Sequence, residues 1–284
     1  MKMIFLRALY NIYINIIYLT VATSYGSLVA GKVVKKVGAY NYKVCEYAHG
    51  TKITNYSKPI YTDQKKRNHR SQLSEAERTP EMIKHSLQTS LNRTKNTIFD
   101  LSKSNEWEFF ITLTFDPKKY DSTNYDTVTK ILTEFMHRMR KKRSKDLIYM
   151  IVPEFHADGK KYHFHGLLAN IGDIKMIPSG HLDKDANDIY NMPAWIYGYS
   201  TATKIKDTVR ASAYITKYIT KECVQHTKHK KRYYASQNIK RPEITYINSP
   251  STLEEVIATY SPDTIKSLEM GGALNRVTYM EIDD

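Results

Sequence analysis

The chain has 284 residues and a mass of 33.0 kDa, which suits one large domain or two small ones. Hydrophobic residues make up 41% and charged residues 25% of the sequence, a composition that excludes a wholly disordered, collagen-like or multi-span membrane protein. The 43 Lys and Arg residues exceed the 29 Asp and Glu residues and give a formal net charge of +14, so we expect a polyanionic partner, either nucleic acid or an anionic membrane surface.

Residues 1–30 begin with a basic start and an apolar stretch of the kind found in signal sequences and membrane helices. Arg7, Asn11 and Asn15 interrupt that stretch, and no clean small-residue cleavage site follows it. The chain has two cysteines, which show no metal-binding spacing and fit a reducing cytoplasm. We therefore favour an optional apolar helix, or a start codon read too far upstream, over export, and we expect no stable membrane partner.

The next part of the chain is predicted to contain a hairpin, a basic linker and a helix. Residues 32–47 have β-branched and aromatic side chains around a Gly-Ala pair, which predicts a hairpin. Residues 51–78 are polar and basic without periodicity, so we interpret them as a linker or a DNA-facing loop, and equally as a merely solvated run of charges. Pro80 suits a first helical turn, and apolar residues at helical spacing predict a helix to about residue 103.

The middle of the chain has the clearest periodicities. Alternating apolar residues predict a strand over 107–115, and apolar residues at helical spacing predict a helix over 124–142. Two further strands, over 147–156 and 162–171, are joined by an Asp-Gly pair that is typical of hairpin turns. This order of elements predicts an α+β protein with an antiparallel sheet and helices on one face.

Basic residues are concentrated at the end of the predicted helix over 124–142 and in a later segment. They exceed what capping of the helix dipole needs. We expect them to follow a DNA backbone, together with one arginine of a further predicted helix: Arg138, Arg140, Lys141, Lys142, Arg143, Arg210, Lys230, Lys231 and Arg232.

Metal-ligating residue types gather on one face of the predicted hairpin. If the Asp-Gly pair at 158–159 forms the turn, Glu154 lies opposite His163, and both share a sheet face with His156 and His165. A lone strand histidine is more often structural. Two imidazoles and a carboxylate on one face, however, make a three-ligand site for a divalent cation, with open positions for water and phosphate oxygens.

A second group of polar residues is predicted on a helix that begins after Asp207, a possible N-cap. A phenol with cations beside it is suited to phosphate chemistry, because the cations favour the phenolate and offset charge that develops on phosphorus. A basic surface helix with packing tyrosines is equally consistent with the pattern. At 3.6 residues per turn, one face would carry the following residues: Arg210, Tyr214, Lys217, Tyr218 and Lys221.

Three segments, in order, resemble the three motifs of rolling-circle replication initiators of the HUH endonuclease superfamily, which is named for its His-hydrophobic-His motif. They are residues 110–116 (FITLTFD), 163–166 (HFHG) and 214–221 (YITKYITK). The spacing of the two tyrosines is most similar to that of initiators of microviruses and related single-stranded phages or plasmids. The resemblance covers about residues 107–222, and residues 231–242 look like a basic segment that often follows.

This resemblance implies an RRM- or ferredoxin-like core in which His163 and His165 hold Mg²⁺ or Mn²⁺, with Glu154 as third ligand and His156 in reserve. Tyr214 or Tyr218 would attack the scissile phosphate of single-stranded DNA at an origin hairpin or nick site, assisted by Lys217 and Lys221. The attack would leave a 5′-phosphotyrosine and a free 3′-hydroxyl. The implied setting is the cytoplasm of a bacterial host, with a host helicase and polymerase as partners. The expected domains are residues 1–30 (apolar segment), 31–105 (hairpin, linker and helix), 106–246 (HUH endonuclease core) and 247–284 (helix-strand extension).

Other functions are less consistent with these residues. A histidine-triad hydrolase needs a third histidine where Leu167 stands, and metallo-β-lactamase-like sites expect an acidic residue and a histidine soon after His165. A non-catalytic, RRM-like protein that binds single-stranded nucleic acid would need aromatic residues on the face that carries Thr112, Thr114 and the histidines. A relaxase or a transposase of the same superfamily stays open.

Overall fold

The structure is a computed structural model of the chain, and it describes residues 38–61, 78–155, 161–227, 230–270 and 275–283. The apolar segment over 1–30 and His156 lie outside these residues. Within the described ranges, no helix is both long and apolar enough to cross a membrane. The α+β class with antiparallel sheets is confirmed, since the described residues form a seven-stranded and a five-stranded antiparallel sheet.

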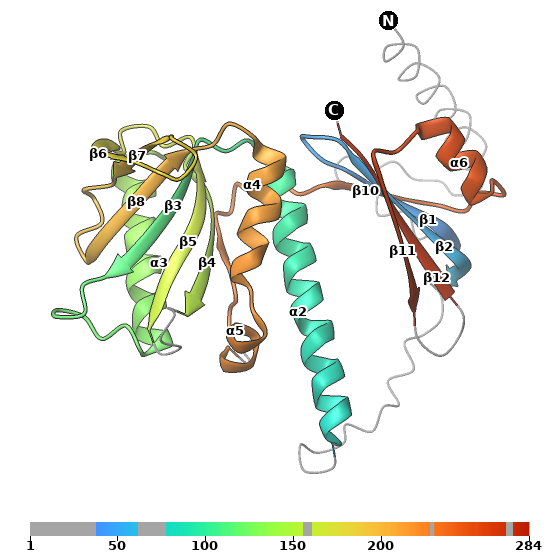
Figure 1. Cartoon of the computed structure of the whole chain (residues 1–284), viewed down its shortest axis with the longest axis horizontal. Helices are drawn as coiled ribbons and strands as arrows, with labels where there is room; N and C mark the ends of the chain where they lie inside the picture. Colours follow the sequence, from blue (N-terminus) through green and yellow to red (C-terminus); the bar gives the residue numbers. More distant parts are fainter. Residues whose placement is uncertain (1–37, 62–77, 156–160, 228–229, 271–274, 284) are drawn as a thin grey trace, which may run out of the picture. The chain divides into compact units, whose positions relative to one another are not determined.

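The seven-stranded sheet has the strand order β6-β7-β8-β3-β5-β4-β9, and every pairing in it is antiparallel (Figure 1). Its central strands are rich in β-branched and aromatic residues, which pack well on a pleated surface. The strands are β3 (Phe109–Phe115), β4 (Ile148–Phe155), β5 (Tyr162–Ala169), β6 (Ile177–Leu182), β7 (Asp188–Asn191), β8 (Gly198–Lys204) and β9 (Tyr234–Ala235).

Helix α3 (Tyr125–Lys142) covers one face of this sheet. Its apolar residues repeat at helical spacing, so Val128, Leu132 and Phe135 form a single buried stripe. The stripe packs against one side of β3, where Ile111 and Leu113 are buried. Asn124 caps the helix by accepting a hydrogen bond from the backbone N–H of Thr127 at 3.0 Å. The predicted helix over 124–142 is therefore confirmed.

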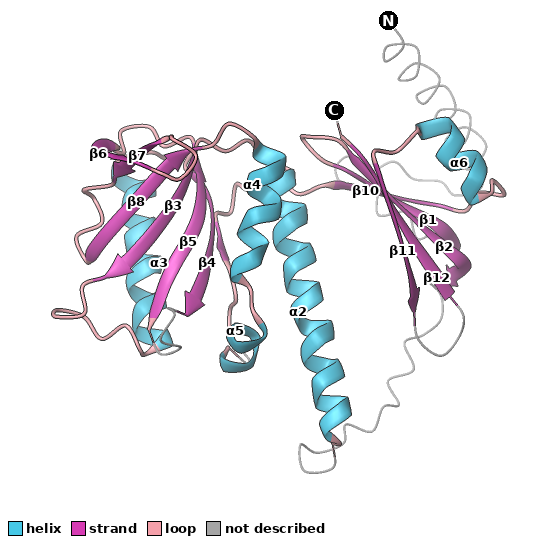
Figure 2. Ribbon diagram, viewed as in Figure 1, coloured by secondary structure: helices cyan, strands magenta, loops and turns pink. Residues whose placement is uncertain are grey.

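The other face of the sheet also carries helices, which corrects the expectation of helices on one face. Helix α2 (Pro80–Lys103) has Pro80 in its first turn, as predicted, and buries Leu91, Ile98 and Leu101. These residues pack with α4 (Thr208–Ile215) and α5 (Lys221–His226) over β4 and β5. Figure 2 shows α4 running alongside α2. The chain after β8 thus returns over the face that α3 leaves open.

The β4–β5 hairpin has the predicted register. Glu154 lies opposite His163, and Val152 lies opposite His165. Because opposed residues share a face of the sheet, Glu154 and both histidines project toward the layer of α4 rather than that of α3. Gly166 follows the His-x-His pair, and a Cβ atom there would lie 2.8 Å from Cγ1 of Ile151.

The five-stranded sheet has the order β10-β1-β2-β12-β11 and joins segments from both ends of the described chain. Helix α6 (Leu253–Tyr260) packs on it through Leu253, Val256 and Ile257. A capping box between Thr252 and Glu255 starts this helix. The strands are β1 (Ala39–Glu46), β2 (Thr51–Tyr61), β10 (Glu243–Ile247), β11 (Thr264–Met270) and β12 (Asn275–Ile282).

The predicted hairpin over 32–47 is wrong in its turn. Ala39 is the first residue of a continuous strand, β1, and the partner strand β2 covers residues 51–61, which we interpreted as linker or loop. The turn lies between the strands, where Gly50 adopts a φ of +79° that favours glycine. Pairing with the distant strands β10 and β12, and not local alternation, holds β1 and β2 in the sheet.

Candidate metal and tyrosine site

Glu154, His163 and His165 form a compact cluster on β4 and β5. Their ligand atoms all lie within 4.8 Å of one another. Oε2 of Glu154 lies 2.9 Å from Nε2 of His163 and 2.7 Å from Nε2 of His165. The same three atoms would face a cation held between them, so the set of donors fits a divalent metal with open coordination positions.

The electrostatics of the cluster follow from its partial burial. Burial would raise the pKa of Glu154, but hydrogen bonds from His163 and His165 outweigh it and lower the pKa to about 2. Burial lowers the pKa of His165, against the opposing effect of Glu154. Both shifts favour a carboxylate and a neutral imidazole near neutral pH, which are the protonation states that bind metal.

Thr112 on β3 supports the cluster from the neighbouring strand. Its Oγ1 lies 3.0 Å from Nδ1 of His165. For Nε2 of His165 to bind a cation, Nδ1 must carry the proton, and Thr112 Oγ1 is placed to accept it in a hydrogen bond. The sequence placed Thr112 on the face of the histidines but did not reveal this contact, whose signal was the register of β3 against β5.

Tyr218 covers the cluster from the helix layer. Its ring stacks on that of His165, with centroids 3.6 Å apart and an angle of 18° between the planes. Burial, the hydrogen bond with Tyr214 and the negative charge of Glu154 all raise the pKa of Tyr218. The ring of Phe110 lies 6.0 Å from that of Tyr218 and 5.4 Å from that of Tyr214. Phe110 is thus a packing residue of the site that the sequence did not indicate.

The two tyrosines lie side by side but differ in exposure. Their ring centroids are 5.5 Å apart, with planes at 85°. The Tyr214 side is open, since this residue is 43% exposed, whereas Tyr218 is half-buried. Lys217 places its Nζ 5.0 Å from the centroid of the Tyr214 ring, so an ammonium does lie beside one of the phenols.

The continuous helix predicted through these residues is wrong. Asp207 caps α4 as predicted, but α4 ends at Ile215, a 3₁₀ turn (η2) covers Thr216–Tyr218, and α5 begins at Lys221. The cause is Thr220, whose side chain accepts a hydrogen bond from the N–H of Cys223 and starts a new helix. Among the described residues, no ion pair or ring contact joins Lys221 to Tyr218.

The predicted DNA-binding residues of α3 lie in the layer opposite the cluster. Arg138 packs its guanidinium over the rings of Phe135 and Tyr197, at 5.6 and 5.9 Å, and is partly engaged in structure. Arg140 donates to the carbonyl oxygen of Lys145 at 3.3 Å. The other three basic residues at this helix end are exposed: Lys141, Lys142 and Arg143.

The remaining predicted basic residues have mixed environments. Arg210 is exposed on α4. Lys230 forms an ion pair with Asp126 at 2.8 Å, and Lys231 is exposed. Arg232 donates to Oγ of Ser90 on α2 and is therefore a structural link. No observation assigns a role to any of these residues, so DNA binding through them stays a prediction.

Comparison with known proteins supports one family for this part of the chain. The family model whose description begins "Replication-associated protein ORF2" matches residues 108–223. These residues include β3, the three cluster residues and both tyrosines, and they span less than half of the chain. No curated protein and no solved structure matches the chain significantly. The match supports a family of replication initiators, which act on DNA.

Proposed function

We propose that the protein is a replication initiator that nicks and rejoins single-stranded origin DNA through a 5′-phosphotyrosine, and so starts rolling-circle replication of a phage or plasmid genome. One observation supports this proposal above all others. A pair of tyrosines lies directly on a cluster of two histidines and a carboxylate, with the ring of Tyr218 stacked 3.6 Å from that of His165. The match of this region to replication-associated proteins agrees with it.

The cluster is proposed to hold Mg²⁺ or Mn²⁺ through Nε2 of His163, Nε2 of His165 and the carboxylate of Glu154. A bound divalent cation would polarise the scissile phosphate and offset charge on its oxygens. Thr112 keeps the His165 ring oriented and its Nδ1 protonated. Tyr218 shields the same ring from water, and the half-buried setting strengthens the electrostatic interactions inside the site.

The covalent step is assigned to one of the two phenols. The Oη–P bond forms while the P–O3′ bond breaks, and the released 3′ oxygen takes a proton and becomes the free 3′-hydroxyl. Lys217, beside Tyr214, would favour the phenolate and stabilise charge on the non-bridging oxygens. Because the phosphotyrosine keeps the energy of the broken diester, the reverse attack by a 3′-hydroxyl reseals a strand without ATP.

The test is covalent capture of labelled DNA. Single-stranded oligonucleotides that cover a candidate origin are labelled at either end and incubated with the protein and Mn²⁺. On a denaturing gel, the 3′-end label should move with the protein, and the 5′-end label should appear on a shortened, protein-free fragment. Chelator should abolish both products.

The control variants separate the proposed site from other tyrosines. The double change Tyr214→Phe with Tyr218→Phe should give no adduct, and Tyr246→Phe, in the five-stranded sheet, should give the wild-type amount. Each change removes one hydroxyl and keeps the ring, so folding should be preserved. An adduct formed by the double variant, or one that carries the 5′-end label, would contradict the proposal.

A further inference from the structure

Tyr199 on β8 lies on the same sheet face as the metal-ligand cluster. Its register partner on β3 is Thr114, and Thr114 is in turn paired with His163 on β5. Glu154, His163, Thr114 and Tyr199 therefore form one row across four neighbouring strands. With about 4.8 Å between adjacent strands, Tyr199 begins roughly 10 Å from His163 along this row.

The Tyr199 ring is unusually open for a strand residue in the sheet that holds the cluster. It is 67% exposed, and among the described residues no hydrogen bond or ring contact engages its side chain. By contrast, Tyr190 and Tyr197, on the neighbouring part of the chain, pack against other aromatic rings. Core packing therefore does not explain the tyrosine at position 199.

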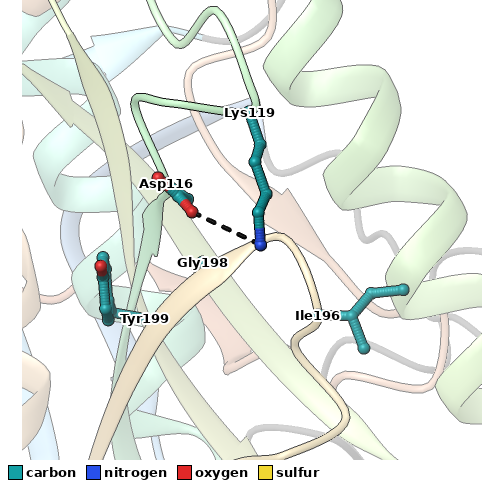
Figure 3. A pocket seen from close by; sticks show the side chains of 5 residues that line it. All are labelled: Asp116, Lys119, Ile196, Gly198 and Tyr199. Carbon is teal, nitrogen blue, oxygen red and sulfur yellow. Dashed lines mark ion pairs between the residues drawn. The ribbon is translucent and has the colours of Figure 1, made fainter.

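A small hollow adjoins this ring at the ends of β3 and β8 (Figure 3). Its volume is about 240 Å³, and it is lined by Asp116, Lys119, Ile196, Gly198 and Tyr199. The volume is below the roughly 300–1,000 Å³ of sites for drug-sized molecules. The hollow therefore suits one planar group rather than a whole small-molecule ligand.

Gly198 sets the position of the ring. A Cβ atom at Gly198 would lie 2.3 Å from the carbonyl oxygen of Thr114 and 2.4 Å from the N–H nitrogen of Asp116. Only glycine allows β8 to start this close to the end of β3. This close approach of the two backbones places Tyr199 directly opposite Thr114.

Charge at the hollow is suited to a phosphate. Lys119 is 72% exposed, and its Nζ lies 3.7 Å from Oδ2 of Asp116, which keeps the ammonium close to the rim. At this distance and exposure the ion pair is weak. A DNA phosphate can therefore contact the ammonium while Asp116 stays bound to the backbone N–H of Lys118 at 3.0 Å.

We propose that Tyr199 is a stacking platform for one base of the single-stranded DNA substrate, and that Lys119 contacts a phosphate beside that base. The inference rests on the proposed function, since single-stranded DNA is its substrate. The row from Glu154 to Tyr199 brings the base within one or two nucleotides of the phosphate at the cluster. Stacking on tyrosine accepts any base, so Tyr199 fixes the position of the strand rather than its sequence.

The experiment measures affinity for a single-stranded oligonucleotide of the candidate origin by fluorescence anisotropy, without metal so that no cleavage occurs. Tyr199→Ala should weaken binding roughly 5- to 100-fold, which corresponds to the loss of one base–aromatic stack. Tyr199→Phe should bind like wild type, because it keeps the ring. Tyr246→Ala, which removes a 38% exposed tyrosine from the other sheet, is the matched control and should have no effect.

A scan with a single abasic nucleotide locates the base. One abasic position should weaken binding by wild type but not by Tyr199→Ala, since the stack is already lost. Lys119→Gln should reduce the slope of log affinity against log salt by about 0.7, as expected for one fewer phosphate contact on a single strand. Equal affinities of Tyr199→Ala and wild type, or an abasic profile that the variant leaves unchanged, would overturn the inference.

The outcomes also separate this inference from the proposed function. If wild type forms the covalent adduct while Tyr199→Ala binds normally, the stacking platform is refuted and the nicking function stands. If Tyr199→Ala weakens binding as expected but wild type forms no adduct with Mn²⁺, the nicking function is refuted and the stacking platform stands.

Discussion

Replacing Thr112 with valine should selectively weaken metal binding. Valine keeps the β-branched shape that suits β3 and removes only the hydroxyl whose Oγ1 lies 3.0 Å from Nδ1 of His165. Without this partner, neither the proton on Nδ1 nor the orientation of the ring is fixed. Nε2 of His165 then presents its lone pair to the cation in only part of the molecules.

The size of the effect follows from the burial of His165. Its side chain is only 8% exposed, and the stacked ring of Tyr218 covers it. A solvent molecule therefore cannot easily replace the lost hydroxyl, and an unsatisfied buried donor costs about 1–3 kcal/mol. Loss of an outer partner of a metal-bound histidine typically lowers metal affinity about 10- to 100-fold, which is about 1.4–2.7 kcal/mol and lies within that range.

The assay is calorimetric titration of the protein with Mn²⁺ in the absence of DNA. Thr114→Val is the matched control, since Thr114 occupies the same strand and face, opposite His163, and no described hydrogen bond joins its hydroxyl to a histidine. It should bind Mn²⁺ within about threefold of wild type, below the range for outer-partner loss. Thermal unfolding of the metal-free variants shows whether both fold equally. Wild-type affinity of Thr112→Val, or equal losses in both variants, would refute the role assigned to Thr112.

Three further outcomes are expected. Single Tyr→Phe changes should slow adduct formation unequally, more at Tyr218, which lies on His165, than at the more exposed Tyr214; equal rates on a time course would contradict this. Because hydrogen bonding lowers the pKa of Glu154 to about 2, its stabilising contribution is complete above about pH 4.5 and is lost as the pH falls toward 2, so urea midpoints of Glu154→Gln should depend less on pH in that window than those of wild type. Leu132→Ala, in a fully buried position of α3, should lower the free energy of unfolding by about 2–5 kcal/mol in urea titrations and leave Mn²⁺ affinity unchanged, since it packs on the other face of the sheet.

The cluster was predictable because it depends on local pairing. A two-residue turn fixes the register of a hairpin, so the positions of Glu154 and His163 followed from the Asp-Gly pair alone. The periodicities of α2 and α3 were equally local and gave the correct helices. Contacts across β3 needed a second register, between strands separated by a helix, which no turn specifies. The link from Thr112 to His165 was therefore hidden from the sequence.

The break after α4 and the second sheet show why the rest could not be predicted. Residues 214–221 have helical spacing, but isoleucine and threonine tolerate a helix poorly, and Thr220 offers its hydroxyl as a competing cap. Residues 51–61 lack clean alternation and become a strand partly through pairing with β12, at the other end of the described chain. Tertiary pairing decides the state of such a segment, and its local pattern does not.

The layers of the seven-stranded sheet separate the chemistry from part of the positive charge. Glu154 and the two histidines face the helices that carry Tyr214 and Tyr218, whereas the basic end of α3 lies in the opposite layer. Packed layers are about 10 Å apart, close to the Debye length at physiological salt, so these charges act on DNA at the cleavage face mainly by long-range attraction. Neutralising Lys141 and Lys142 should therefore slow association and reduce its salt dependence, whereas changes on the row from Glu154 to Tyr199 should alter cleavage or the position of the strand. Attraction of DNA and its cleavage are thus separable by mutation, because different layers of one sheet carry them.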